Sequence, residues 1–546
     1  MAPTTTHCHM INGAAQNGAA AVVVPVETEM APASCAHLLD ADEFRRQGYQ
    51  VIDFIADYYA GMGDYPVHPS VTPGFLRRQL PAAAPSQPEP DAFAAALKDV
   101  RDLILPGMTH WQSPRHFAHF PASSSIAGAL GEALTAGINV VPFTWSASPA
   151  ATELEMVVVD WLGKALHLPE SLLFCGGGGG TVLGTSCEAI LCALVAARDR
   201  KLAEIGGGRL GDLVVYCSDQ THFAFRKAAH IAGIHRDHCR AIATCRDDMF
   251  ALSPTELRAA MQADADAGLV PLFLCATIGT TQTTAVDPIG ELCAVAAAHG
   301  GVWVHVDAAY AGSALVCPEF RDVVAGVEAV DSFSMNAHKW LLANTDCCAL
   351  WVRRPALLVA ALGTEQEYIL KDAAAAGADD ALDYKDWSAT LTRRFRALKL
   401  WLVLRCYGVE GLREHVRAHV RMAEAFEGMV RADARFEVTA ARRFALVCFR
   451  LRSPEKFGGE KKANELNRRL LEEVNRNGTG PYMSSAMVDG VFMLRCAIGS
   501  TLTEERHVRE AWKVVQARAA AILRKMEILH SAWLPKLDYA TLLGDK

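Results

Sequence analysis

Residues 302–312 read VWVHVDAAYAG, a largely apolar run that is closed by an acid, Asp307. Strands with continuous apolar character are covered on both faces, as in parallel sheets flanked by helices. Ligands of such sheets bind at the carboxyl ends of the strands. The stretch therefore predicts a buried strand that carries Asp307 to the edge where a ligand binds.

Four further stretches share this apolar character: LVVYCS (213–218), AIATC (241–245), VPLFLCATIG (270–279) and CCALWV (347–352). Helical patterns separate them, and the helix at 149–166 has Ser148 as its cap and Pro149 at its first position. Apolar strands that alternate with helices form a mostly parallel sheet with helices on both faces. We expect this α/β region to span about residues 123–400.

The flanking regions differ from this sheet. Residues 1–37 have no helical or strand period, which predicts a disordered leader. Residues 38–122 begin with an amphipathic helix capped by Asp40, and its apolar stripe needs a partner such as a second copy of the chain. Small and acidic residues at about 361–383 predict a mobile loop. Residues 401–546 contain the strands RFALVCFRL and VFMLRCAIGS and suit a small α+β domain.

Composition argues against several kinds of partner. The 546 residues carry a net charge of −8 with no basic run, so we expect no binding to nucleic acid or to an anionic membrane. The 16 cysteines are scattered through apolar segments without CxxC spacing, so we expect reduced core residues and no metal. We find no targeting signal and no membrane-spanning run, and we expect a cytoplasmic protein.

Residues 175–202 run from a glycine loop, CGGGGGT, into a long helix. No register satisfies GxGxxG and no GK[ST] follows, which excludes a dinucleotide fingerprint and a P-loop. Free backbone N–H groups at the helix start, with the hydroxyls of Thr185 and Ser186, predict a site for one phosphate. A flexible linker is the alternative for this stretch taken alone.

The segment NAHKWLL, residues 336–342, places Lys339 in apolar surroundings. The lysine stem can pack on the core with its ammonium in water. Alternatively, a desolvated amine with a pKa well below about 10.4 can form a Schiff base with a carbonyl. A buried Asp307 needs a positive partner, either a structural arginine or a protonated pyridine nitrogen, for which Ala309 leaves room. His222 follows the strand 213–218 and is either a stacking residue or a core histidine.

Taken together, these residues offer a phosphate site, an acid for a ring nitrogen, a residue to stack on a ring, and a lysine amine. Pyridoxal 5′-phosphate has these four requirements. Because the combination is far more specific than its parts, the sequence predicts this cofactor.

Four stretches, residues 120–155, 216–233, 305–321 and 336–342, resemble those of the aromatic-L-amino-acid decarboxylases, the group II pyridoxal-phosphate decarboxylases. The plant tyrosine and tryptophan decarboxylases are the most similar branch. The similarity runs from about residue 38 to about residue 531. It implies the aspartate-aminotransferase-like fold, pyridoxal-phosphate fold type I, and an intertwined homodimer whose active sites take loop residues from the neighbouring subunit.

The resemblance also implies a role for individual residues. Lys339 binds the cofactor covalently, Asp307 pairs with its ring nitrogen, and His222 stacks on the ring. Further cofactor contacts fall on Ser186, Cys187, Thr281, Ala309, Ser332, Asn336 and His338, where the position of Cys187 often carries serine in relatives. The aromatic side-chain pocket falls on Trp111, Phe120, Phe143 and Trp145.

Two positions bear on the reaction and the substrate. Tyr368, in GTEQEYILKD, stands where the resembling decarboxylases carry the tyrosine that protonates the substrate, whereas aromatic aldehyde synthases carry phenylalanine there. Thr392 stands where tryptophan enzymes tend to have glycine and tyrosine enzymes serine, and its hydroxyl favours tyrosine or DOPA. Decarboxylation to an amine is therefore expected. The alternatives are a tryptophan or phenylalanine decarboxylase, an aldehyde synthase, and a catalytically silent cofactor-binding protein.

Overall fold

A computed structural model describes residues 38–87, 91–364, 382–453 and 459–531. The expected leader and most of the expected loop at 361–383 lie outside these residues. The chain divides into two compact units, residues 1–57 and 58–546. The domain boundaries inside the second unit, near residues 122 and 400, stay predictions.

The first unit contains most of helix α1 (Ala41–Ala60). Its start is capped as expected, because Asp40 Oδ1 accepts the backbone N–H groups of Asp42 at 3.1 Å and of Glu43 at 2.8 Å. The apolar side chains of α1 include Phe44 and Tyr49, which are exposed to 69% and 62%.

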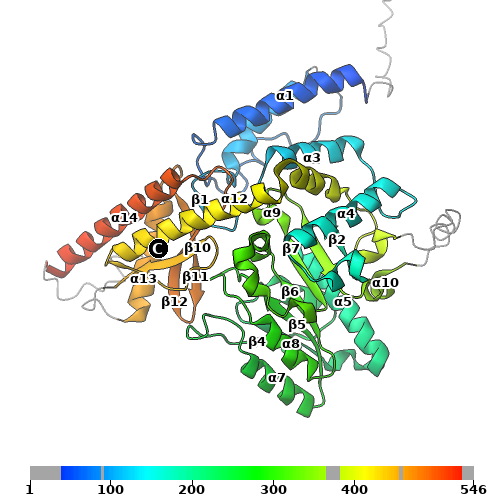
Figure 1. Ribbon diagram of the computed structural model, residues 1–546. Helices are drawn as coiled ribbons and strands as arrows, with labels where there is room; N and C mark the ends of the chain where they lie inside the picture. Colours follow the sequence, from blue (N-terminus) through cyan, green and yellow to red (C-terminus); the bar gives the residue numbers. More distant parts are fainter. Residues whose placement is uncertain (1–37, 88–90, 365–381, 454–458, 532–546) are drawn as a thin grey trace, which may run out of the picture. The chain divides into compact units, whose positions relative to one another are not determined.

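A seven-stranded sheet forms the centre of the second unit (Figure 1), and its strand order is β2-β8-β7-β6-β5-β3-β4. The five strands β3 to β7 run parallel to one another, whereas β8 runs antiparallel to both β2 and β7. The expected mostly parallel sheet is confirmed. The strands are β2 (Gly179–Leu183), β3 (Leu213–Ser218), β4 (Cys239–Ile242), β5 (Val270–Thr277), β6 (Trp303–Asp307), β7 (Ser332–Asn336) and β8 (Cys348–Val352).

Alternate residues of these strands enter two separate cores, as the period of a strand requires. Val214 and Val304 belong to one core, and Val215 and Trp303 belong to the other. Helices α4 (Pro149–Ala165), α7 (Pro254–Asp266) and α8 (Ile289–Ala297) contribute to the first core. Helices α5 (Ser186–Ile205), α6 (Ala224–Ile231) and α10 (Pro355–Leu362) contribute to the second. Both faces of the sheet are therefore covered, which explains the continuous apolar character of the strands.

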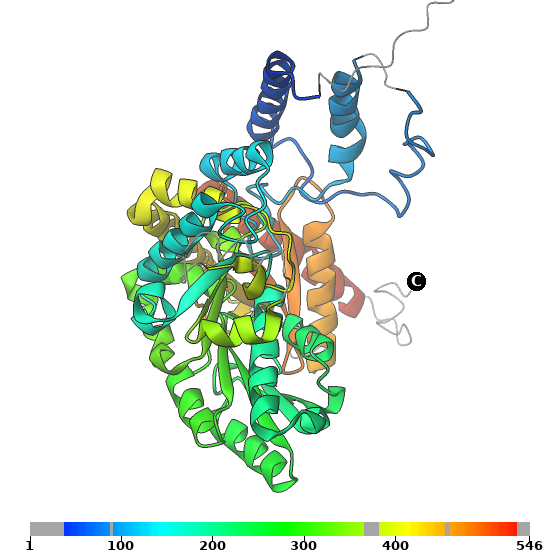
Figure 2. The ribbon, with the colours of Figure 1, turned by 90° about the vertical axis from the view of Figure 1, so that its right-hand side faces the viewer.

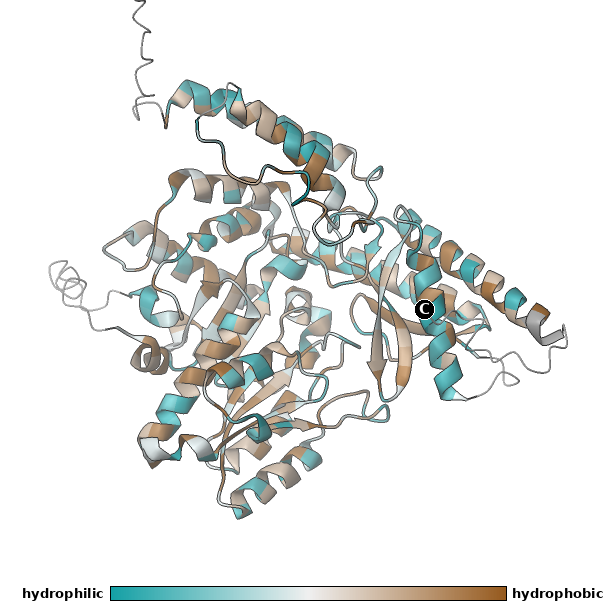
Figure 3. Cartoon of the chain, turned by 180° about the vertical axis from the view of Figure 1, so that it is seen from behind, coloured by the Kyte–Doolittle hydropathy of each residue, from teal (hydrophilic) through white to brown (hydrophobic). Residues whose placement is uncertain are grey.

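A second, smaller sheet has the strand order β1-β11-β12-β10-β9. Its strands are β1 (His116–Phe117), β9 (Phe436–Val438), β10 (Leu446–Leu451), β11 (Tyr482–Val488) and β12 (Val491–Ala497). Figure 2 shows the orange strands of this sheet beside helix α13 (Glu460–Asn475). In Figure 3, polar and apolar residues alternate along α14 (Glu505–Ser531). The long helix α12 (Arg396–Ala432) is kinked at Gly408, where φ is 60°.

The remaining described helices are α2 (Ala92–Asp99), α3 (Ile126–Ile138) and the short α9 (Ala337–Trp340). None of the described helices combines the length and the apolar character that crossing a membrane requires. α4 begins at Pro149 as expected, although the Ser148 side chain makes no capping hydrogen bond.

Two strands of this sheet, β2 at its edge and β7 inside it, were not anticipated, because glycine and serine give them no apolar pattern. In β7, the serines are buried because Ser332 and Ser334 hydrogen-bond the ring nitrogens of His305 at 2.8 and 3.1 Å. β4 begins at Cys239, two residues before the expected strand.

Candidate active site

The carboxyl ends of the parallel strands meet at one edge of the central sheet, where a cavity of about 240 Å³ lies. This cavity is lined by nine of the ten residues that were expected to contact the cofactor, and by Phe120 from the expected aromatic pocket. The lining residues are Phe120, Thr185, Ser186, Cys187, His222, Ala224, Thr277, Gly279, Thr281, Asp307, Ala309, Tyr310, Asn336, His338 and Lys339.

Lys339 follows β7 in the short helix α9 and lines the cavity. Burial lowers the pKa of the Lys339 amine, and the carboxylate of Asp307 opposes this shift. The amine nitrogen lies 5.9 Å from the centre of the Phe120 ring. A lysine amine with a lowered pKa has more of its neutral form near pH 7 than a surface lysine, so Lys339 is suited to attack a carbonyl.

Asp307 is the last residue of β6 and is only 4% exposed. Its Oδ1 accepts the backbone N–H of Ala309 at 3.0 Å. Among the described residues, no lysine, arginine or histidine lies within 4.0 Å of this carboxylate as an ion-pair partner. The structural arginine that the sequence left open is therefore absent from this part of the chain, and the carboxylate can accept a hydrogen bond from a cationic ligand.

His222 lies between β3 and α6. The backbone N–H of Ala224 donates to His222 Nδ1 at 3.3 Å, so the proton of the neutral ring is on Nε2. Burial lowers the pKa of His222, an effect that Asp307 opposes and Lys339 reinforces. The ring is therefore uncharged near neutral pH, as stacking on a cationic heterocycle requires.

The start of α5 forms another wall of the cavity. Thr185 is the N-cap residue, and the Ser186 hydroxyl donates to Asn336 Oδ1 at 2.9 Å. The first turn of a 20-residue helix has free N–H groups that favour an anion. Thr277 Oγ1 is buried at the same cavity and has no hydrogen-bond partner among the described residues. This end of the cavity therefore supplies hydroxyls and N–H groups to a phosphate.

His338 is fixed by the chain that returns from α9. His338 Nδ1 lies 2.9 Å from the backbone nitrogen of Cys347 and 3.0 Å from its carbonyl oxygen, so Cys347 holds this ring nitrogen in either tautomer. Burial, with a smaller effect of Lys339, lowers the pKa of His338 to about 4. His338 is therefore uncharged near neutral pH.

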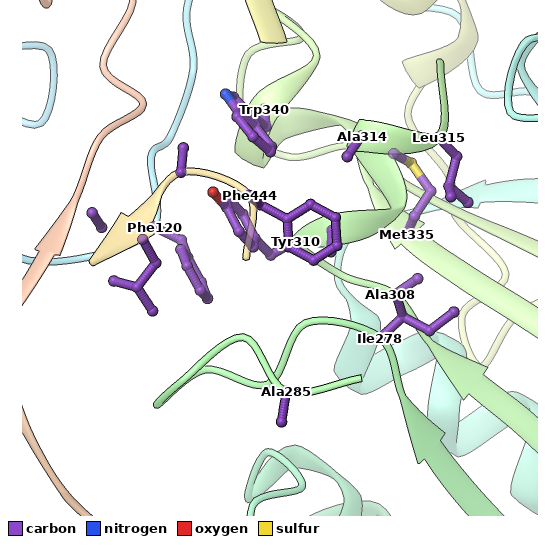
Figure 4. Close-up of a cluster of buried hydrophobic side chains, with 14 of the residues drawn as sticks. Phe120, Ile278, Ala285, Ala308, Tyr310, Ala314, Leu315, Met335, Trp340 and Phe444 are labelled. Carbon is purple, nitrogen blue, oxygen red and sulfur yellow. The ribbon is translucent and has the colours of Figure 1, made fainter. Parts of the chain in front are cut away.

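Three aromatic rings, two of which line the cavity, form a stack (Figure 4). Tyr310 lies between Phe120, at 3.7 Å between ring centres and an angle of 8°, and Trp340, at 4.9 Å and 12°. Trp340 Nε1 donates to His419 Nδ1 at 2.9 Å, which fixes the far end of the stack. The stack connects the wall of the cavity to the residue that follows Lys339.

The glycine run itself does not line the cavity, whereas Thr185 and Ser186 at the helix start that follows it do. Gly179 and Gly180 are buried in β2, and the helix that lines the cavity begins later, at Ser186. A Cβ on Gly179 would lie 2.8 Å from the Trp387 ring, and a Cβ on Gly180 would lie 2.4 Å from a methyl of Val159. Close packing of the sheet against its neighbours is thus the reason for these glycines.

Ser332 also lies away from the cavity. It is the first residue of β7, whereas Asn336 at the other end of the strand lines the cavity. Its hydroxyl accepts the indole N–H of Trp303 at 2.8 Å and hydrogen-bonds His305. In this structure Ser332 supports the sheet beneath the site.

Most of the expected aromatic pocket is not assembled at the cavity by one chain. Trp111, Phe143, Trp145 and Thr392 do not belong to its lining. Trp111 is 39% exposed, Phe143 and Trp145 are partly buried, and Thr392 is exposed. Tyr368 lies outside the described residues.

Sequence reasoning missed Arg495, in β12. Its guanidinium carbon lies 5.4 Å from the Phe120 ring centre, and it donates to the carbonyls of Ala118, Thr281 and Gln282. Among the described residues it forms no ion pair. The sequence offered a reason to single out Arg495, because it is the one charged residue in the apolar stretch VFMLRCAIGS.

Comparisons with known proteins find relatives that match most of this chain. The family model described as the pyridoxal-dependent decarboxylase conserved domain matches residues 73–452. A tyrosine decarboxylase of rice (Oryza sativa subsp. japonica) is 81% identical over 533 residues, which cover 96% of this chain and 100% of the relative. A phenylacetaldehyde synthase of a Rosa hybrid cultivar is 54% identical over 501 residues, which cover 91% of this chain and 97% of the relative. The crystal structure of an Oryza sativa TDC with PLP and tryptamine superposes with a TM-score of 0.86 at 47% identity, and covers 89% of this chain and 99% of that chain.

Proposed function

The chain belongs to the pyridoxal-dependent decarboxylase family, and from this premise we propose that it decarboxylates aromatic L-amino acids, with tyrosine and DOPA preferred. The products are the arylalkylamine and CO₂. The 81% identity to a tyrosine decarboxylase over almost the whole chain supports the substrate class. The observation that carries the chemistry is one cavity lined by Lys339, Asp307 and His222.

The residues of the cavity fit pyridoxal 5′-phosphate. The unsatisfied Thr277 hydroxyl, the start of α5 and the neutral His338 suit a phosphate, and the unpaired carboxylate of Asp307 suits a protonated ring nitrogen. We assign the covalent attachment to Lys339 and the stacking contact to His222. When bound, the cofactor supplies a cationic ring that accepts the electron pair of the broken Cα–carboxylate bond.

The chain's own residues control charge, orientation and protons. Asp307 would pair with the positive charge of the cofactor's ring nitrogen, and the neutral His222 would stack on the ring. Phe120 and Tyr310 exclude water from the wall of the cavity. We assign delivery of a proton to the substrate Cα to Tyr368, which lies outside the described residues.

Substrate preference rests on the pocket residues. Hydrogen bonding to a phenol discriminates more strongly than a difference of one methylene in an apolar pocket, which is worth about 1–3 kcal/mol. The hydroxyl of Thr392 favours a phenolic ring by hydrogen bonding and by denying space to an indole, whereas its added methyl group departs from the serine of tyrosine enzymes and favours phenylalanine. We therefore rank tyrosine and DOPA above phenylalanine and tryptophan.

We further propose that the active enzyme is a homodimer. Trp111, Phe143, Trp145 and Thr392 can form the substrate pocket only if a second chain brings them to the cavity. Helix α3 offers a surface for this contact, because Ile126, Leu130, Leu134 and Ile138 are exposed to between 48% and 77% at four-residue spacing. A continuous exposed apolar stripe of this kind marks a protein interface.

We also propose a cytoplasmic location. The 14 cysteines among the described residues are all free. Free thiols in this number suit a reducing compartment.

A second candidate is an aromatic aldehyde synthase, because the rose phenylacetaldehyde synthase is 54% identical. The distinguishing experiment incubates the purified protein with tyrosine, DOPA, phenylalanine and tryptophan separately, and quantifies CO₂, amine and hydrogen peroxide. Amine equal to CO₂ without peroxide supports the decarboxylase and ranks its substrates. Peroxide equal to CO₂ would establish the aldehyde synthase, and no CO₂ from any substrate would overturn both.

A further inference from the structure

A second cavity, of about 520 Å³, lies at the β4 edge of the central sheet, away from the site described above. Helix α6, the turn after it and β4 form its walls (β4 is labelled in Figure 1). Its lining residues are Arg226, Lys227, Ala229, His230, Ile234, His235, Arg236, Cys239 and Ala241. None of them lines the first cavity.

The second cavity is strongly basic in a chain whose net charge is −8. Five of its nine lining residues are arginine, lysine or histidine, and none is an acid. Within the described part of the chain, Arg226, Lys227 and Arg236 form no ion pair, and Asp237 contacts His235 at 3.7 Å. The neighbouring Arg240 is already paired with Asp264. The positive charge around the cavity is therefore largely uncompensated and attracts small anions.

Cys239 adds a thiol to these walls. Cys239 and Ala241 are two residues apart in β4, so their side chains lie on the same face of the sheet. In the neighbouring strand β3, Val215 pairs with Cys239 and Cys217 pairs with Ala241, so the Cys217 side chain lies on that face too. The two thiols hydrogen-bond each other. Cys239 is partly exposed, whereas Cys217 is 1% exposed.

The two sulfur atoms have opposite acidities. The hydrogen bond from Cys217, together with the nearby Arg226, lowers the pKa of Cys239 against the effect of burial. The pKa of Cys217 is raised well above its ordinary value by the same hydrogen bond and by burial. Cys239 is thus the nucleophile of the pair, and Cys217 keeps its proton as the donor.

We propose that Cys239 is a thiol-modification site that forms a mixed disulfide with small disulfides carrying several carboxylates, which the basic walls of this cavity bind. The Cys239 thiolate attacks one sulfur of the disulfide. A bond from Sγ to that sulfur forms, the original S–S bond breaks, and the second half leaves as a thiolate with the electron pair. Cys239 is oxidised to the mixed disulfide, the leaving half of the small disulfide is reduced to a thiolate, and no further oxidant is needed.

The mixed disulfide is expected to persist. Resolution by Cys217 requires a thiolate in the buried core, which its raised pKa disfavours. In addition, Cys217 pairs across the sheet with Ala241 and is diagonal to Cys239. Diagonal neighbours have Cα atoms about 7–8 Å apart, beyond the usual range for a disulfide.

The test compares two small disulfides of opposite charge on the holoenzyme: dianionic 5,5′-dithiobis(2-nitrobenzoate) and dicationic cystamine. Peptide mapping follows the modification rate of each thiol. Cys245 is an internal control, since it is exposed and its thiol donates to Asp248 at 3.3 Å. Cys406 is a second exposed control. Glutathione disulfide is then used as a probe that carries carboxylates, with intact mass as the readout.

We expect Cys239 to react at least about 10-fold faster with the dianion than with the dication, because basic clefts raise the local concentration of anions by about 10-fold or more. Cys245 should show no such preference. At about 1 M salt, where the Debye length is about 3 Å, the preference should fall severalfold. Glutathione disulfide should add one glutathionyl group at Cys239.

The variant Arg226→Gln/Arg236→Gln should lose the charge preference, whereas Arg258→Gln on α7 should keep it. Equal rates of Cys239 with the two disulfides in the unaltered protein would overturn the proposal without reliance on any variant. An internal disulfide of Cys217 and Cys239 without an adduct would also overturn it.

Discussion

Replacing Asp307 by asparagine removes one charge from the cavity while keeping the size of the side chain. Asp307 is 4% exposed, accepts one backbone N–H, and has no ion-pair partner among the described residues. Among the described residues that line the cavity, Asp307 is the one acid. Asp307→Asn should therefore lose most of the electron-withdrawing character of the bound cofactor and lower kcat strongly.

The size of the loss follows from the burial of Asp307. Breaking a buried, hydrogen-bonded ion pair costs about 3–5 kcal/mol. Since each 1.36 kcal/mol is tenfold in rate, this corresponds to a kcat lower by a factor between about 150 and about 5,000. The same substitution should lower the pKa of Lys339 further, because the Asp307 carboxylate is what opposes the effect of burial on that amine.

The assay measures CO₂ release from tyrosine at saturating cofactor, with bound cofactor quantified separately so that lost binding is distinguished from a lower kcat. Asp212→Asn is the matched control, because Asp212 is an exposed partner of Arg209, and its kcat should change by less than about twofold. If Asp307→Asn retained kcat within about tenfold of the unaltered enzyme at full cofactor occupancy, the assignment of Asp307 to the ring nitrogen would be wrong.

Three further predictions concern protonation and stability. Tyr368→Phe should shift the product from amine toward aldehyde with hydrogen peroxide, and an unchanged ratio of amine to CO₂ would show that another group protonates the substrate. Arg393→Gln breaks a 2.7 Å ion pair whose two side chains are at most 2% exposed, and should cost about 3–5 kcal/mol, seen as earlier thermal inactivation. Arg394→Gln, in an ion pair in which Arg394 is 51% exposed, should cost about 0–1 kcal/mol, and equal inactivation temperatures for the two variants would contradict this reasoning. Burial lowers the pKa of His419 from 6.5 to about 4, so its contribution to stability is present above pH 6.5 and lost as the pH falls toward 4. His419→Gln should therefore show a smaller drop in unfolding temperature between about pH 7 and about pH 5, and an unchanged drop would assign acid sensitivity to other groups.

The local pattern of the chain identified most of the central sheet. Strands such as β5 and β6 are apolar on successive residues because two separate cores pack on their opposite faces. β7 was not predicted, because its serines are polar residues that become buried by hydrogen-bonding His305. This histidine lies 27 positions before Ser332 and 29 positions before Ser334. A contact of that range leaves no trace in the local pattern of either strand.

Only part of the candidate site could likewise be predicted from the sequence. Lys339, Asp307 and His222 could be named from the sequence, since each has a chemical character that its apolar surroundings make conspicuous. The role of the glycine run could not, because a requirement for close packing and a requirement for phosphate contact select the same residue. Arg495 lies over Phe120 only because β12 of the small sheet folds against the loop after β1.

By itself, then, the sequence determined the type of sheet, the edge at which a ligand binds and the cofactor chemistry, because burial and charge are properties of short segments. Tertiary structure decided which hydroxyl remains without a partner, how Tyr310 stacks between Phe120 and Trp340, and that Cys239 shares a basic cavity with Arg226 and Arg236. These features join side chains from separate helices and strands, and their distances follow from the packing of whole elements rather than from any local pattern.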